Sequence, residues 1–282
     1  MSPTFGILYC SYSIPEMVEM SLEPWVEARS RHSVKIAAVS GMFKENFELG
    51  MPDTDVVTGM DLGVCEAEKQ IDFTYLQNWY EEGEKIDFNN VKRVYQTEAE
   101  IRDKGLQFLL KAGVDYVIVA DGDERFLSEE IDRLFNYIQK DPFVCWYRFY
   151  YKNLIFDDNT YVKEFCPPRV FRVNYNNAYQ LNQFIYDNDV SYKGLITRDI
   201  VNYQQLPSKT IPDTVLEPLH YTWNDYERSV SKIKYQEKRW NPPNGNGCSL
   251  RVNEQERKIE WNLDYFKRVG QSIPQTYKLQ CI

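Results

Sequence analysis

An apolar run that ends directly in acidic residues is the feature that most constrains the fold of this chain. Residues 117–120 (Val-Ile-Val-Ala) have the unbroken apolar pattern of a strand buried on both faces of a parallel sheet. Residues 121–124 (Asp-Gly-Asp-Glu) follow at once. Open α/β sheets bind ligands beside the carboxyl ends of their strands. Two carboxylates at that place suit a Mg²⁺ or Mn²⁺ ion that holds substrate phosphates, so the pattern predicts a metal-dependent enzyme acting on a phosphorylated donor.

The first sixty residues have the rhythm of a doubly wound sheet. Apolar segments at 5–10, 34–39 and 55–58 predict strands, and helical spacing over 16–28 predicts a helix between the first two. Alternation of strands and helices is typical of an α/β fold with a mostly parallel sheet.

The middle of the chain continues this alternation. A capping box at 97–100 (Thr-Glu-Ala-Glu) predicts the start of a helix that ends at Gly113, because glycine is favoured just beyond a helix. Ser128 is expected to cap a second helix, whose apolar residues recur at 131, 134, 135 and 138. Residues 143–151 and 168–173 are expected to be strands.

The carboxyl-terminal third has a weaker pattern. Residues 174–215 are expected to form loops and short elements around an acceptor pocket, and 219–223 a strand. Helices are expected over 225–240 and 254–269, separated by the Pro-, Gly- and Asn-rich linker 241–247. We therefore expect a catalytic domain over 1–223 and a helical extension over 224–282.

Composition excludes several classes of protein. The net charge of −9 makes nucleic acid a poor partner, because phosphate backbones need a basic surface. No apolar stretch approaches the roughly 20 residues that span a bilayer, so no membrane span is expected. The six cysteines form no C-x-x-C pair, and no basic-apolar leader begins the chain, so a soluble, cytoplasmic protein with reduced thiols is expected.

The chain has two histidines, and they have different sequence settings. His32 lies in a polar connection and is expected at the surface. His220 begins the aromatic strand expected over 219–223. A neutral imidazole beside Asp121 and Asp123 would complete a set of three metal ligands and leave positions for phosphate oxygens.

These motifs, in this order, resemble those of family 2 glycosyltransferases of the GT-A fold. The resemblance covers roughly residues 5–240, from the first strand through the Asp121-Gly122-Asp123 turn to His220 and the basic helix after it. The segment Arg169-Val170-Phe171-Arg172 is also similar to a strand in bacterial surface-glycan transferases of this family. The implied fold is a Rossmann-like mixed central sheet flanked by helices.

The resemblance also implies an activity. It is the transfer of a sugar from a nucleoside-diphosphate donor to a glycan or other hydroxyl acceptor, with inversion expected. The implied nucleotide-binding residues are Ser11, Tyr12, Ser13, Arg102, Asp121 and Gly122. The implied ligands of Mn²⁺ or Mg²⁺ are Asp121, Asp123 and His220, and Lys232, Lys234 or Arg239 would neutralise the leaving group.

Two features depart from the family pattern. Ser40-Gly41-Met42 stands where members commonly carry an acid that reads the nucleobase, so the base is not specified. The general base is not marked by a single acid either. Asp187 and Asp189 are the favoured candidates, and the further acids after the Arg-Val-Phe-Arg segment are Asp199, Asp213 and Glu217.

Other functions fit the acidic turn less well. Arg125 stands where a haloacid-dehalogenase-type phosphatase needs Thr or Val, and Arg125 and Phe126 occupy positions where a calcium loop needs an oxygen ligand and glycine. A sugar nucleotidyltransferase usually carries a glycine-rich loop after its first strand, which is missing here. An inactive glycan- or nucleotide-binding protein on the same fold remains an alternative.

Overall fold

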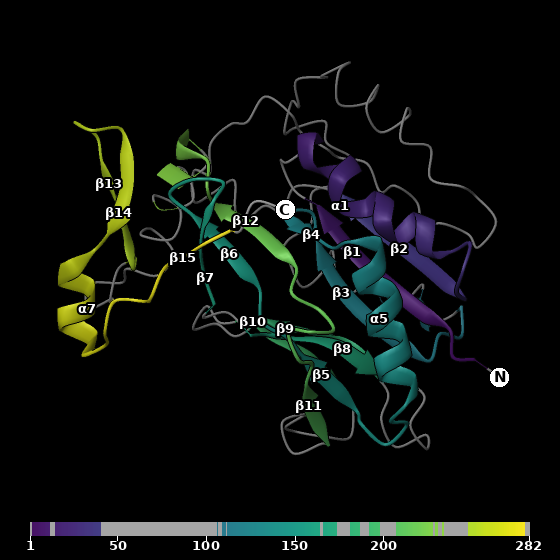
Figure 1. Cartoon of the computed structure of the whole chain (residues 1–282). Helices are drawn as coiled ribbons and strands as arrows, with labels where there is room; N and C mark the ends of the chain where they lie inside the picture. The colour runs from purple at the N-terminus through teal and green to yellow at the C-terminus, as the bar shows by residue number, and fades with distance from the viewer. Residues whose placement is uncertain are drawn as a thin grey trace, which may run out of the picture.

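The computed structural model of the chain describes residues 2–11, 15–40, 106, 109–110, 112–163, 166–173, 181–186, 192–197, 207–227, 229–230, 233 and 248–279. Figure 1 shows a central sheet covered by helices, a second sheet beside it, and a carboxyl-terminal unit at the far side of the second sheet. The coarse prediction of an α/β fold is confirmed.

The first sheet has six strands in the order β11-β5-β8-β3-β1-β2. Its parallel half has β1 (Phe5–Ser11) at the centre, between β2 (Val34–Ser40) and β3 (Tyr116–Asp121). Its other half consists of β8 (Pro168–Arg172), antiparallel to β3, then β5 (Trp146–Arg148) and the edge strand β11 (Ser208–Thr210). The sheet is therefore mixed, and β3 lies where the parallel and antiparallel halves meet.

Helices α1 (Pro15–Ala28) and α5 (Ser128–Gln139) pack together on one face of this sheet (Figure 1). Alternate residues of β1 point to this face, where the ring of Phe5 stacks on that of Phe135 at 4.0 Å between centroids. On the other face, Leu8 and Val117 pack with Leu109, which lies in the helical segment that precedes β3 in the chain. Because both faces are covered, β3 is apolar and buried from Tyr116 to Ala120 as predicted.

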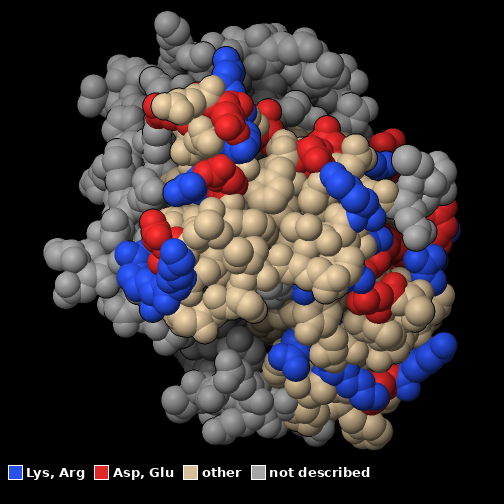
Figure 2. Space-filling view, turned by 60° about the vertical axis from the view of Figure 1, so that its left-hand side comes forward, with Lys and Arg blue, Asp and Glu red and all other residues tan. Residues whose placement is uncertain are grey.

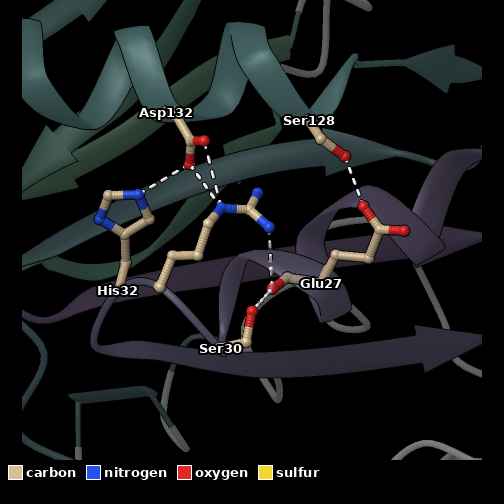
Figure 3. A network of polar contacts seen from close by, with 6 residues as sticks. Glu27, Ser30, His32, Ser128 and Asp132 are labelled. Carbon is tan, nitrogen blue, oxygen red and sulfur yellow. Dashed lines mark hydrogen bonds and ion pairs between the residues drawn. The ribbon is translucent and has the colours of Figure 1, made fainter.

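Polar contacts join the carboxyl end of α1 to α5 (Figure 3). Asp132 of α5 accepts hydrogen bonds from His32 Nε2 at 2.8 Å and from Arg31 Nε at 3.1 Å. Ser128 Oγ donates to Glu27 at 2.5 Å. His32, expected at the surface, lines an open hollow there, but its ring is half-buried and lies edge-on to Phe135.

The second sheet has the order β15-β7-β6-β12-β4, and it is joined to the first sheet after β3. Its edge strand β4 (Glu124–Arg125) follows β3 after only two residues, Gly122 and Asp123. Its neighbour β12 (Leu219–Trp223) runs antiparallel to β4 and parallel to β6 (Lys152–Ile155). The Asp-Gly-Asp turn thus joins the two sheets.

The far side of the second sheet carries the carboxyl-terminal unit. The strand β7 (Thr160–Val162) pairs with β15 (Tyr277–Lys278), while β13 (Leu250–Asn253) and β14 (Lys258–Trp261) form a hairpin followed by α7 (Leu263–Val269). A separate apolar cluster contains Ile233, Cys248, Leu250 and Ile259, against which Trp223 and Trp261 pack. Strands β9 (Leu181–Tyr186) and β10 (Tyr192–Thr197) form another antiparallel pair.

One residue at the edge of this cluster has an unusual backbone. Phe156 has φ = 66°, and Asp157 N donates to the Ile155 carbonyl at 2.7 Å, which makes a γ-turn of the rare positive-φ kind. The ring of Phe156 contacts Trp261 edge-on at 5.5 Å between centroids. The turn therefore directs an aromatic side chain from the second sheet into the carboxyl-terminal cluster.

Charges of both signs are interspersed on the face that includes this unit (Figure 2). Arg251 pairs with Glu260 at 2.6 Å and Arg257 with Glu227 at 2.7 Å. Among the described basic residues of the tail, Arg251, Arg257, Lys258 and Lys278 thus take part in ion pairs.

Several expected elements differ from the observed ones. The helix expected over 254–269 is wrong in its first half, where a hairpin turn and β14 are found, and right in its second half. Ser128 is the first residue of α5 rather than its cap, since Leu127 holds the N-cap position and its N–H is accepted by Glu130. The strand expected over 143–151 is only three residues long, and the described part of 174–215 contains strands. The strand expected at 55–58 and the capping box expected at 97–100 lie outside the described residues.

The proposed division at residue 223 stays a prediction, although β15 from the carboxyl-terminal part pairs with β7 of the amino-terminal part. Among the described helices, none has both the length and the apolar character that a membrane span requires.

Candidate functional site

The acidic turn is held by a buried carboxylate that belongs to the same tetrad. Glu124 is completely buried, and its Oε2 accepts a hydrogen bond from the backbone N–H of Asp121 at 3.1 Å. This bond closes residues 121–124 into a compact turn at the carboxyl end of β3. The turn has a fixed shape before any ligand arrives.

Arg169 is the counter-ion of this turn. Its Nη2 donates to Glu124 Oε1 at 2.6 Å and to Asp121 Oδ2 at 2.9 Å, and the residue is only 4% exposed. Arg169 reaches the turn because β8 runs antiparallel to β3, so the beginning of β8 lies beside the end of β3. The guanidinium therefore connects the strand that carries the turn with the next strand of the sheet.

The charge on Glu124 is set by two opposing effects. Complete burial raises the pKa of its carboxyl, the positive charge of Arg169 lowers it, and the balance lies at about 7. Asp121 and Asp123 add to the increase, because a further negative charge beside them is unfavourable. The turn thus concentrates three carboxyl groups, and burial favours the neutral form of the innermost one.

His220 faces the second carboxylate of the turn. His220 Nε2 lies 3.4 Å from Asp123 Oδ2, and the two side chains are 12% and 20% exposed. The backbone also joins them, since Tyr221 N–H donates to the Asp123 carbonyl at 2.8 Å. Cross-strand pairing of His220 with Glu124 fixes this register. The predicted proximity of Asp123 and His220 is therefore found.

The other side of the imidazole is held by β6. His220 Nδ1 lies 2.7 Å from Asn153 Oδ1, across the pair that these residues form in the parallel register of β12 and β6. The ring of Tyr151 lies 5.4 Å from that of His220 and 5.7 Å from the Arg169 guanidinium. Burial raises the pKa of Tyr151 well above its ordinary value, so its hydroxyl stays protonated.

The three residues expected to bind a metal lie near one another, but they have different neighbours. Asp123 and His220 face each other, whereas Asp121 contacts Arg169. Within the described ranges, no three His, Cys, Asp or Glu side chains are gathered closely enough to share one metal ion. The pair still fits Mg²⁺ or Mn²⁺, because one or two protein ligands with phosphate oxygens and water complete the shell of such ions. The three-ligand set stays a prediction.

The predicted nucleotide-binding residues are only partly described. Cys10 of β1 is paired with Asp121 of β3, so Ser11, the last residue of β1, follows directly beside the turn. Gly122 lies within the turn itself. Tyr12, Ser13 and Arg102 lie outside the described residues, as do the predicted bases Asp187 and Asp189 and the cations Lys232, Lys234 and Arg239.

Two of the less favoured base candidates are engaged elsewhere. Glu217 pairs with Lys152 at 2.6 Å and also contacts Lys163, which pairs with Asp213 at 2.9 Å. The Glu217 carboxylate is therefore occupied by two ammonium groups, so it is less available to an acceptor hydroxyl. Asp199 lies outside the described residues.

Two open hollows lie away from the acidic turn. One of about 480 Å³ lies between α1 and the segment after β4 and is lined by Met20, Glu27, Arg125 and Leu127, among others. Another of about 440 Å³ is lined by Arg29, Arg31 and His32, among others. Neither is lined by Asp121, Asp123 or His220, so neither defines a donor site.

Three residues of the site were not assigned a role from the sequence. They are Asn153, Glu124 and Arg169. Glu124 belongs to the tetrad and Arg169 to the strand noted for its similarity, so both lay within motifs already marked. Asn153 carries no such signal, because only the pairing of β6 with β12 brings it to His220.

The chain matches no model of a known protein family and no curated protein.

Proposed function

We propose that the protein is a metal-dependent glycosyltransferase that uses a nucleoside-diphosphate sugar. The observation that carries this proposal is the pairing of Asp123 with His220 at the carboxyl end of β3, 3.4 Å apart. A nitrogen and an oxygen donor at this end of a sheet suit a divalent cation bound to phosphates. The order of the Asp121-Gly122-Asp123 turn and the later His220 in the sequence resembles that of family 2 glycosyltransferases.

The architecture supports the proposal without being specific to it. Three parallel strands end beside the acidic turn, and the antiparallel strand β8 begins there and supplies Arg169. A nucleotide bound at the end of β1 would have Ser11 on one side and Asp121 on the other. This placement agrees with the binding of nucleotides at the carboxyl ends of parallel strands.

The residues would divide the chemistry between them. Asp123 and His220 would hold the cation on the diphosphate, and Arg169 and Glu124 would keep the turn in place. A bound divalent cation would stabilise the negative charge that develops on the leaving nucleoside diphosphate. Asp187 or Asp189 is the proposed base that takes the proton of the acceptor hydroxyl.

Calorimetric titration of UDP, GDP and dTDP tests the donor site. Each nucleotide is added to the protein with and without Mn²⁺, and the same is done for Asp123→Asn. We expect one nucleotide to bind only with Mn²⁺, and at least tenfold weaker in the variant, because the exchanged amide removes a charged ligand. Asp264→Asn, at an exposed position of α7, is the matched control and should bind like the wild type.

The outcomes separate the alternatives. Nucleotide binding that needs no metal and survives Asp123→Asn would contradict the role of the turn and favour a nucleotide-binding protein. If no nucleotide binds under either condition, the transferase proposal is wrong. Where a nucleotide does bind, hydrolysis or transfer from the matching sugar nucleotide then distinguishes an enzyme from an inactive binding protein.

A further inference from the structure

The side-chain amide of Asn153 is buried, and its hydrogen-bond partners fix its orientation. It lies in the middle of the second sheet on β6, is 7% exposed, and is paired across the register with His220. A buried amide needs partners for both its N–H₂ and its oxygen, since an unpaired buried polar group costs about 1–3 kcal/mol. Its hydrogen bonds therefore fix which way the amide points.

The partners of Asn153 allow one orientation. Nδ2 lies 3.4 Å from the Tyr151 carbonyl and 3.3 Å from the Val162 carbonyl, and both of these oxygens only accept. A reversed amide would put its oxygen against two carbonyl oxygens. The amide oxygen must therefore face His220 Nδ1, from which it lies 2.7 Å.

An amide oxygen can only accept, so Nδ1 of His220 must carry the hydrogen. In the neutral ring, Nε2 then has no hydrogen and presents its lone pair to Asp123 Oδ2 at 3.4 Å. Two electron-pair donors that face each other in this way form a site for a cation.

We propose that Asn153 is a positioning residue that fixes the Nδ1–H tautomer of His220 and so makes Nε2 a metal ligand. The metal half of this inference rests on the proposed function, whereas the tautomer does not. Hydrogen bonds from the second nitrogen of a ligating histidine to a neighbouring acceptor commonly orient the ring in this way. Asn153 would thus act on the metal through His220 without touching it.

Nitrogen-15 spectra of the imidazole rings test the tautomer directly. The chain has only His32 and His220, so a His32→Gln background leaves one ring to observe. In alkaline buffer, where the ring is neutral, we expect the hydrogen on Nδ1 and a lone pair on Nε2. A hydrogen on Nε2 in this otherwise native protein would overturn the inference, whatever any further variant does.

Asn153→Leu removes the acceptor at similar volume. We expect the Nδ1–H tautomer to lose its dominance, because Asp123 Oδ2 beside Nε2 then remains as an acceptor. Thr160→Val is the matched control, since Thr160 is equally buried on β7 and bonds to Asp157 instead of His220. Retention of pure Nδ1–H in Asn153→Leu, or its loss in Thr160→Val, would also contradict the role of Asn153.

Mn²⁺ titration of the same proteins tests the metal half. We expect Asn153→Leu to bind Mn²⁺ about 10- to 100-fold more weakly than the wild type, and Thr160→Val to bind it equally well. If the wild type binds no Mn²⁺ but has the Nδ1–H tautomer, the metal proposal fails and the positioning of His220 stands. If Mn²⁺ binds with equal affinity in Asn153→Leu, the effect of Asn153 on the metal is refuted.

Discussion

At the scale of single residues, the candidate site depends on two buried charges that compensate each other. Glu124 is fully buried and Arg169 is 4% exposed, and they lie 2.6 Å apart. Burying either charge alone is strongly unfavourable. Together they hold Asp121, because Glu124 accepts from its backbone N–H and Arg169 donates to its carboxylate. The positions of the two aspartates in the turn therefore depend on a buried pair.

Removal of the cation from this pair should destabilise the protein strongly. We expect Arg169→Leu to lower the free energy of unfolding by about 3–5 kcal/mol, because Glu124 is left buried without its counter-ion. Urea denaturation followed by circular dichroism measures this change. The exposed pair of Arg31 and Asp132 provides the control, where Arg31→Leu should cost less than about 1 kcal/mol.

The double variant Arg169→Leu with Glu124→Leu separates charge from packing. It should recover a large part of the lost stability, because no unpaired charge remains. Equal losses in the single and double variants would show that Arg169 contributes by packing instead.

The sequence identified the outer residues of the site better than the inner ones. Asp121, Asp123 and His220 can be recognised in the sequence because they are ionisable residues next to apolar or aromatic strands. Arg169 and Asn153 look like ordinary strand residues, and only the antiparallel course of β8 and the parallel course of β6 bring them to the turn. Strand order is a property of the whole chain, which local sequence does not contain.

At the scale of elements, β1 has one position, Gly6, where the packing leaves little room for a side chain. Gly6 lies between β2 and β3 in register, and a Cβ atom there would meet Val114 Cγ2 at 3.0 Å and Leu109 Cδ2 at 3.1 Å. The helical segment containing Leu109 can approach the sheet closely only because this position has no side chain.

Gly6→Val should therefore destabilise the fold by about 1–3 kcal/mol, as overpacking of a core usually does. The free energy of unfolding from urea denaturation is the readout. Combining it with Leu109→Ala should give a loss smaller than the sum of the two single losses, because the smaller side chain makes room for valine. Strict additivity would mean that the two residues do not share the contact.

Elements with strong periodicity were predicted well, and those held by tertiary contacts were not. The helix α5 was expected because its apolar residues recur at helical spacing and become the buried face. Residues 254–261 are rich in helix-forming charged residues, yet they form a turn and β14. Ile259 is buried there in the carboxyl-terminal cluster, and Arg251 pairs across the hairpin with Glu260. Arg257 also adopts φ = 46° in the turn, which helical spacing does not reveal.

At the scale of the whole molecule, the carboxyl-terminal unit is attached at the outer edge of the second sheet. Lys278 of β15 donates to Asp157 Oδ2 at 3.2 Å, and the rings of Tyr277 and Tyr161 stack at 5.5 Å. The separate cluster around Ile259 and the positive-φ turn at Phe156 complete this attachment. Trp223 of β12 thus links the second sheet to the carboxyl-terminal cluster.

This attachment should weaken in acid. Partial burial of Asp157 tends to raise its pKa, but hydrogen bonds from Thr160, Asn159 and Lys278 outweigh it and lower the pKa from 3.8 to about 2. A lowered folded-state pKa stabilises the protein above pH 3.8, and this contribution is lost as the pH falls toward 2. Since Asp157 is half-exposed, we expect less than about 1 kcal/mol from it.

Hydrogen exchange of the β15 amides over this pH range measures the effect. After correction for intrinsic exchange, protection should fall between pH 3.8 and 2 in the wild type. Asp157→Asn should start with lower protection and lose that pH dependence. Equal pH dependence in both proteins would show that another group controls the attachment.

The turn at residues 122–123 has a mechanical consequence. β3 is hydrogen-bonded within the first sheet and β4 within the second. Asp121 therefore ends a strand of the first sheet, whereas the carbonyl of Asp123, in the turn, accepts a hydrogen bond from Tyr221 of the second. A ligand bound by both carboxylates would bridge the junction between the two sheets and would oppose movement of one sheet relative to the other. Ligand binding at the turn would then reduce the motion of β12, which pairs with β4. Because Trp223 of β12 packs against the carboxyl-terminal cluster, the effect would extend to that cluster.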